Sequence, residues 1–117
     1  MNTEMPPDFA VSADAVGTAY VVRPLGELDL GTVDELGAAV ASRPDTCPEL
    51  VLDLSGLTFF DTSGMRLVVE TLQDAQRSGI SLALVRGTED VQRLFALAGM
   101  QDRLPFVDDL DEALARG

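Results

Sequence analysis

The fold of this 117-residue chain is decided by the stretch Leu50-Val51-Leu52-Asp53-Leu54, a nearly continuous apolar run of strand length. Such a run is typical of a strand covered on both faces, as in the interior of a parallel sheet. A helical pattern follows from about Thr62 to Ser78, and Gly79 is a typical residue to end it. A buried strand followed by an amphipathic helix predicts a right-handed crossover to a parallel strand, and therefore an α/β fold.

Upstream of this stretch, an antiparallel hairpin is expected. Two β-prone runs, Phe9–Ala13 and Ala19–Leu25, are separated by the turn-like segment Asp14-Ala15-Val16-Gly17. Pro24 is expected to end the second strand near its tip, or to bulge it, because proline has no N–H to give to a neighbouring strand. The chain should therefore begin with two strands that pair with each other.

The remaining elements alternate between helices and strands. Apolar residues recur at helical spacing from Thr32 to Ser42, Thr32 and Glu35 have capping-box spacing, and Arg43-Pro44-Asp45 then stops this helix. The later elements are a strand at Ile80–Val85, a helix that starts after Thr88 and ends at Gly99, a short extended piece at Leu104–Val107, and a helix at Asp108–Arg116. This order predicts a single α/β domain with a mixed sheet of about five strands and four helices.

Composition restricts the possible classes of protein. Hydrophobic residues make up 46% of the chain, too many for a disordered protein, yet no apolar run approaches the roughly 20 residues of a membrane helix. A cytoplasmic location is therefore expected. The formal net charge of −12, from 20 acidic and 8 basic residues, disfavours nucleic acid and membrane partners. Cys47 is the only cysteine, which excludes an intrachain disulfide.

Residue types also argue against catalysis and against a metal or cofactor. The chain has no histidine, no P-loop and no glycine-rich dinucleotide turn. The acidic residues at 108–112 are better explained as the start of a helix with a solvated face than as a metal site. A hydrolase that used Thr62 or Ser63 would need a base, and the adjacent Asp61 is a weak one. We therefore expect neither a catalytic residue nor a cofactor.

The one candidate functional site lies where the apolar strand region passes into the long helix. Two aromatic residues precede Asp61-Thr62-Ser63-Gly64, so two hydroxyl groups stand at a helix N-terminus. Free backbone N–H groups and the positive end of the helix dipole would accommodate a phosphate on Thr62 or Ser63. Gly64 would leave room for a partner to approach. The same residue types are ordinary helix caps, so the residues alone leave both interpretations open.

A family resemblance separates these interpretations. The stretch Phe60-Asp61-Thr62-Ser63-Gly64-Met65 resembles the signature of STAS-domain anti-sigma factor antagonists, and Leu25-Gly26-Glu27-Leu28-Asp29 resembles the family's turn after its second strand. Residues 50–55 and the later helix at 91–99 are also similar to the family. The resemblance runs from about Phe9 to Ala115 and implies the STAS fold. The first seven residues contain Pro6-Pro7 and no periodicity, so a flexible N-terminal arm at 1–7 is expected before the STAS domain at 8–117.

The resemblance implies a switch rather than an enzyme. An unphosphorylated antagonist of this family binds an anti-sigma factor that is also a serine/threonine kinase, which releases the sigma factor. The kinase phosphorylates the antagonist with ATP and magnesium, the complex dissociates, and a phosphatase resets the protein. The acceptor position falls on Thr62, with Ser63 as the second choice. The residues expected to bind the partner are Gly26, Glu27, Asp29, Asp61, Thr62, Ser63, Gly64, Met65 and Arg66.

Two positions depart from the family pattern. Thr62 stands where serine is more usual, and Arg66 stands where the family often has a small residue. Arg66 is expected either to pair with a phosphate or an acidic partner, or to be an ordinary solvated arginine. The alternative function is a STAS interaction module that is not phosphorylated, such as a stressosome scaffold or the small subunit of a lipid-transport ATPase complex.

Overall fold

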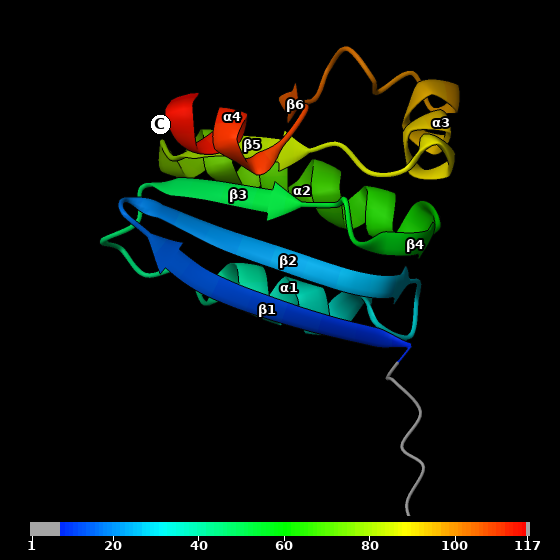
Figure 1. Ribbon diagram of the computed structural model, residues 1–117, viewed down its shortest axis with the longest axis horizontal. Coiled ribbons are helices and arrows are strands. Elements are labelled where there is room, and N and C mark those ends of the chain that lie inside the picture. Colours follow the sequence, from blue (N-terminus) through cyan, green and yellow to red (C-terminus); the bar gives the residue numbers. More distant parts are fainter. Residues whose placement is uncertain (1–7, 117) are drawn as a thin grey trace, which may run out of the picture.

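The computed structural model describes residues 8–116, and the predicted N-terminal arm lies outside the described residues. Within this range the chain forms a mixed sheet covered by helices on both faces (Figure 1). The strands are β1 (Phe9–Val16), β2 (Ala19–Leu28), β3 (Glu49–Asp53), β4 (Leu57–Phe60), β5 (Ser81–Val85) and β6 (Phe106–Val107). The helices are α1 (Val33–Ala41), α2 (Thr62–Ser78), α3 (Glu89–Leu97) and α4 (Leu110–Arg116).

The sheet has the strand order β1-β2-β3-β5-β6, with β4 also paired to β2. The β1–β2 pair is antiparallel and every other pair is parallel, so the predicted α/β fold with a mixed sheet and four helices is confirmed. The sixth strand, β4, was not predicted. It pairs with β2 directly beyond the part of β2 that pairs with β3, which places two successive strands along one edge of β2.

The hairpin is longer than the sequence pattern suggested. Of the four residues expected to form the turn, Asp14 to Val16 belong to β1, because Asp14 pairs with Val21 and Val16 pairs with Ala19. The turn itself consists only of Gly17 and Thr18, and Gly17 adopts a positive φ of 62°. A two-residue turn of this kind keeps the register between two long strands.

Pro24 does not end β2, which corrects one of the two sequence-based expectations, whereas the other, an irregularity near the strand's tip, is present. The hydrogen bond from Glu27 N to Asp8 O fixes which residues of β2 bond to β1, and Pro24 is at an alternating position whose nitrogen faces the other way. On that side the pairing with β3 has ended at Val22, and the pairing with β4 begins at Gly26. No strand therefore needs the missing N–H, and the register shift occurs slightly later, between Gly26 and Glu27.

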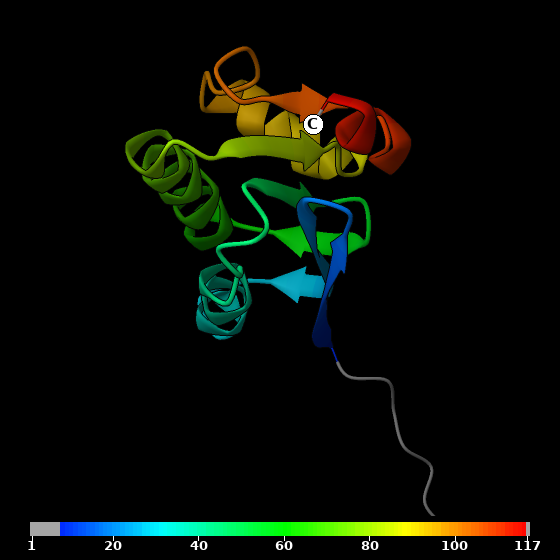
Figure 2. The same cartoon turned by 90° about the vertical axis from the view of Figure 1, so that its left-hand side faces the viewer.

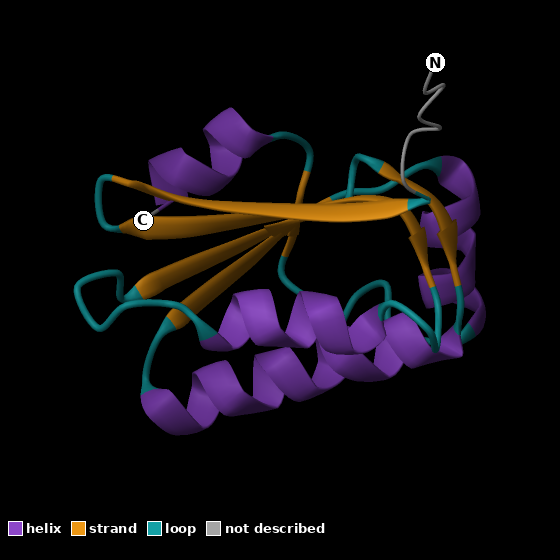
Figure 3. Cartoon of the chain, turned by 90° about the horizontal axis from the view of Figure 1, so that it is seen from below, coloured by secondary structure: helices purple, strands orange, loops and turns teal. Residues whose placement is uncertain are grey.

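The core has two parts, one on each face of the sheet. Helices α1, α2 and α3 pack on one face, and α4 covers part of the other (Figure 3). Alternate residues of β3 enter the two parts, so that Leu52 packs beneath the first three helices and Val51 packs beneath α4. Both side chains are at most 2% exposed, which confirms that the apolar run is a strand covered on both faces.

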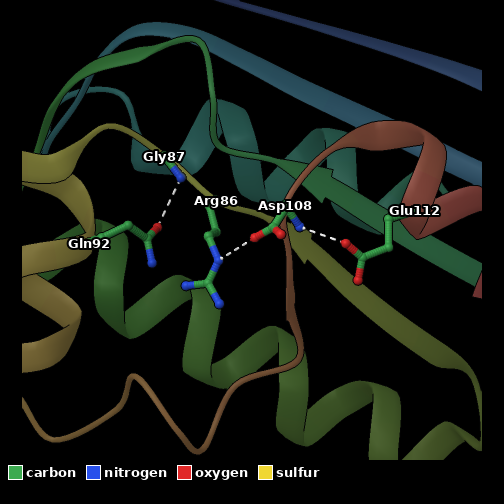
Figure 4. A network of polar contacts seen from close by, with 5 residues as sticks. All are labelled: Arg86, Gly87, Gln92, Asp108 and Glu112. Atoms are coloured by element: carbon green, nitrogen blue, oxygen red, sulfur yellow. Dashed lines mark hydrogen bonds and ion pairs between the residues drawn. The ribbon is translucent and has the colours of Figure 1, made fainter.

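Polar contacts join the segment that follows β5 to helix α3 and to the start of helix α4 (Figure 4). Arg86, at the end of β5, donates from Nε to Asp108 Oδ1 at 3.0 Å, and Gly87 N donates to Gln92 Oε1 of α3 at 2.9 Å. Glu112 Oε1 accepts from Asp108 N at 3.1 Å. The acidic residues here make the hydrogen bonds of a helix start, as the sequence predicted.

Candidate functional site

The candidate site lies at the end of the sheet where β2 and β4 finish. These strands are parallel and Leu28 pairs with Phe60, so the residues that follow each strand emerge side by side. After β2 comes the turn at 29–32, and after β4 comes the N-terminus of α2 at Asp61. Helices α1 and α2 then run next to each other along the same face of the sheet (Figure 2). The fold thus brings together the two sequence motifs that predicted the site.

Asp61 caps helix α2. Its Oδ1 accepts from Ser63 N at 2.9 Å and from Gly64 N at 3.4 Å, and its backbone is extended (φ −123°, ψ −171°). The carboxylate therefore occupies N–H groups that the sequence analysis had assigned to a phosphate. A phosphate on the neighbouring residue would lie beside this carboxylate and would meet its negative charge.

The two candidate hydroxyl groups differ in accessibility. Thr62 is the first residue of α2 and is exposed, whereas Ser63 is only partly exposed. Among the hydrogen bonds of residues 8–116, neither hydroxyl takes part in one. The Thr62 hydroxyl is therefore the more accessible of the two.

Gly64 contributes to internal packing, which corrects the expectation that it leaves room for a partner. The residue is buried in the first turn of α2. A Cβ at this position would stand 2.7 Å from Phe60 Cε1 and 2.8 Å from Leu28 Cδ2. The missing side chain thus lets α2 approach the ends of β2 and β4. Its neighbour Met65 is partly buried and packs against the same core.

The turn after β2 is held by its own side chains. Thr32 Oγ1 donates to Glu27 O at 2.9 Å and accepts from Asp29 N at 3.0 Å. Asp29 Oδ1 accepts from Gly31 N at 2.9 Å. The predicted capping box with Glu35 is wrong, because the Thr32 side chain makes no capping hydrogen bond to helix α1. It bonds to the backbone of Glu27 and Asp29 instead. The turn is therefore a fixed structure beside the start of α2.

Gly26 sets the approach to this turn. Its φ of 95° is one that only glycine adopts readily, and a Cβ there would overlap the backbone carbonyl of Asp8. Its N–H donates to Gly56 O at 3.1 Å. Gly26 thus contributes its backbone conformation and its N–H to this part of the fold. Glu27 beside it has an exposed side chain.

A surface groove of about 780 Å³ separates α1 from α2. Of the predicted site residues, Thr62, Ser63 and Arg66 line it. Arg66 is exposed and forms no ion pair within the described part of the chain. The other groove residues were not predicted; they are Leu30, Val33, Asp34, Gly37, Leu67 and Glu70. A sequence signal existed for Leu30 alone, because a large apolar residue is unusual in a polar turn.

The described residues offer little for other kinds of site. Across 8–116, no three His, Cys, Asp or Glu side chains are placed to hold a metal ion together. In the same range no helix has both the length and the apolar character that crossing a bilayer requires. The nearest carboxylate to the Thr62 and Ser63 hydroxyls along the chain is Asp61, and it is engaged as a helix cap. The geometry is therefore that of an exposed threonine hydroxyl beside a surface groove.

Comparison with known proteins identifies the family of this chain. The model of the STAS domain family matches residues 10–113. The anti-sigma-B factor antagonist of Staphylococcus aureus is 30% identical over 84 residues, which cover 71% of this chain and 78% of the relative. The chain belongs to the STAS-domain family of anti-sigma factor antagonists. The family predicted for this STAS domain from its sequence is thereby confirmed.

Solved structures share the whole fold of this STAS domain. An anti-sigma factor antagonist from Mycobacterium paratuberculosis is similar with a TM-score of 0.78 and 26% identity, covering 95% of this chain and 96% of that one. The Bacillus cell fate determinant SpoIIAA in its phosphorylated form is similar with a TM-score of 0.70 and 20% identity, covering 92% and 98%. The predicted STAS fold is thereby confirmed.

Proposed function

We propose that this STAS domain is a phosphorylation-controlled antagonist. In its unphosphorylated form it binds an anti-sigma factor that is also a serine/threonine kinase, and this binding releases the sigma factor. Phosphorylation of Thr62 ends the binding, and a phosphatase restores it. The observation that carries the proposal is the exposed Thr62 hydroxyl, which stands at the rim of the α1–α2 groove beside the turn at 29–32.

The surroundings of Thr62 favour an electrostatic switch. A phosphate adds about −1.5 to −2 charges at pH 7. It would lie next to Asp61, whose carboxylate already bonds to the first N–H groups of α2, and the groove also contains Asp34 and Glu70. An uncompensated charge inside an interface costs about 3 kcal/mol or more, which corresponds to roughly a hundredfold in affinity. Release therefore requires no refolding of the domain.

The structure favours Thr62 over Ser63 as the acceptor, in agreement with the family signature. Thr62 is exposed and Ser63 is partly covered. Ser63 also donates its backbone N–H to Asp61, so movement of this residue into a kinase active site would disturb the helix cap. The phosphorylated form of SpoIIAA shows that a protein of this fold exists with a phosphate.

The test uses purified kinase-type anti-sigma factors from the same genome. Each is incubated with this protein and ATP, and the phosphate is mapped by mass spectrometry. We expect a label on Thr62 that Thr62→Ala removes and the matched variant Ser63→Ala retains. Loss of the label in Ser63→Ala alone would move the acceptor to Ser63. Tight binding without any label would instead favour the unphosphorylated interaction module.

Binding measurements then test the switch itself. We expect Thr62→Ala to bind the kinase as tightly as the unmodified protein does and to resist release by ATP. Thr62→Glu should bind at least tenfold more weakly, because one negative charge then stands permanently beside Asp61. Equal affinities of the alanine and glutamate variants, measured by isothermal titration calorimetry, would refute the charge mechanism.

A further inference from the structure

Leu30 is an exposed apolar residue that the family signature does not explain. Within residues 8–116, the large hydrophobic side chains that face solvent are Val16, Leu25, Leu30, Phe59 and Leu97. Leu30 is 77% exposed, and of these side chains only Leu30 lines the groove that contains Thr62. An exposed leucine by itself is ordinary. A leucine at the rim of the groove that carries the acceptor hydroxyl is a candidate anchor for a partner.

Hydrogen bonds within the turn fix the backbone position of Leu30 in the free protein. Leu30 lies between Asp29, which accepts the N–H of Gly31, and Thr32, whose hydroxyl bonds back to the backbone of Glu27 and Asp29. Thr32 N and Val33 N also donate to Asp29 O, at 3.1 and 2.9 Å. A side chain on such a fixed turn loses little conformational freedom when it is buried, which favours tight association.

The groove next to Leu30 combines an apolar floor with acidic walls. Val33 of α1 and Leu67 of α2 are partly buried and supply apolar surface. Asp34 and Glu70 are exposed along the same groove, and Arg66 is its one basic lining residue. With a net charge of −12 on the whole chain, a basic occupant is attracted and a second copy of this chain is repelled.

We infer that the α1–α2 groove binds a segment of the kinase that presents an apolar side chain to Leu30 and a lysine or arginine to Asp34 and Glu70. This inference rests on the proposed function, since the kinase is the partner named there. It assigns the affinity of the complex largely to Leu30, whereas Thr62 provides the switch. The two roles are separable because Leu30 is fixed by the turn after β2 and Thr62 by helix α2.

The experiment compares Leu30→Ala with Leu97→Ala in titrations against the purified kinase that labels Thr62. Leu97 is a matched control, because it is 79% exposed and lies on α3, outside the groove. We expect Leu30→Ala to weaken binding at least tenfold and Leu97→Ala to change it less than twofold. Circular dichroism shows that each variant is folded, which is expected since both side chains are at the surface.

The acidic walls are tested by charge reversal. Asp34→Lys should weaken binding at least tenfold more than Asp14→Lys, which makes the same change in net charge on an exposed residue of β1. Equal effects of these two variants would overturn the basic contact.

The outcomes also separate the two proposals. If the unmodified protein binds and is labelled on Thr62, but Leu30→Ala binds as tightly as Leu97→Ala, the groove inference is overturned and the switch stands. If no kinase binds the unmodified protein, both are overturned.

Discussion

Replacement of Gly64 by alanine should destabilise the domain. The added methyl group would stand 2.7 Å from Phe60 Cε1 and 2.8 Å from Leu28 Cδ2, closer than carbon atoms approach. Phe60 is 9% and Leu28 0% exposed, so neither side chain has free space to enter. Overpacking of this kind costs about 1–3 kcal/mol. The higher helix propensity of alanine relative to glycine offsets at most about 1 kcal/mol of this cost.

The expected net loss is therefore up to about 2 kcal/mol in the free energy of unfolding, or up to roughly 8 °C in Tm for a domain of this size. Urea denaturation followed by circular dichroism measures it. The control is Gly37→Ala in α1, where the new methyl would lie 3.7 Å from Leu67 Cδ1, an ordinary contact. Neither glycine has a positive φ, so strain in the backbone affects neither variant.

The control should gain about 0.5–1 kcal/mol, because alanine restricts the unfolded chain and favours the helix. The two glycines thus predict changes of opposite sign from the same chemical substitution. If Gly64→Ala were as stable as Gly37→Ala, the close packing of α2 on Phe60 and Leu28 would be refuted.

Two further substitutions test the hydrogen bonds around the site. Asp61→Ala should lower the free energy of unfolding by about 1 kcal/mol because it removes the cap of α2. Asp61→Asn keeps a hydrogen-bond acceptor and should lower this free energy less. Equal urea midpoints for the two variants would contradict the cap. Thr32→Val keeps the shape of the side chain but removes its bonds to Glu27 O and Asp29 N. It should cost about 1–2 kcal/mol and speed hydrogen exchange at the Asp29 amide, and unchanged exchange would show that Thr32 does not hold the turn.

Local patterns were sufficient where an element's own residues carry the signal. The helix predicted from Thr62 to Ser78 has those bounds in the structure, and Gly79 ends it with a φ of 70°. The apolar strand lies within one residue of its predicted place, at Glu49–Asp53. Both elements combine a strong hydrophobic pattern with a clear stop, and neither depends on the identity of a distant partner.

Strand β4 was missed for the opposite reason. Its four residues, Leu57–Phe60, are too few to show a period, and they follow β3 after a break of three residues. They form a strand because the far end of β2 offers unpaired backbone groups at Gly26–Leu28. The same end of β2 was itself missed, since Pro24 suggested a stop and only the neighbouring strands show that no bond is required there.

The sequence by itself determined the α/β class, the long helix and the motif at Asp61–Gly64, because each depends on residues that are neighbours in the chain. Only the tertiary structure decided what that motif does locally: Asp61 takes the helix N–H groups, Gly64 faces inward, and Thr62 faces a groove. The groove exists because parallel β2 and β4 end together and carry α1 and α2 to the same place. Leu30 and Thr62 are 32 positions apart in the sequence, so no local pattern joins them.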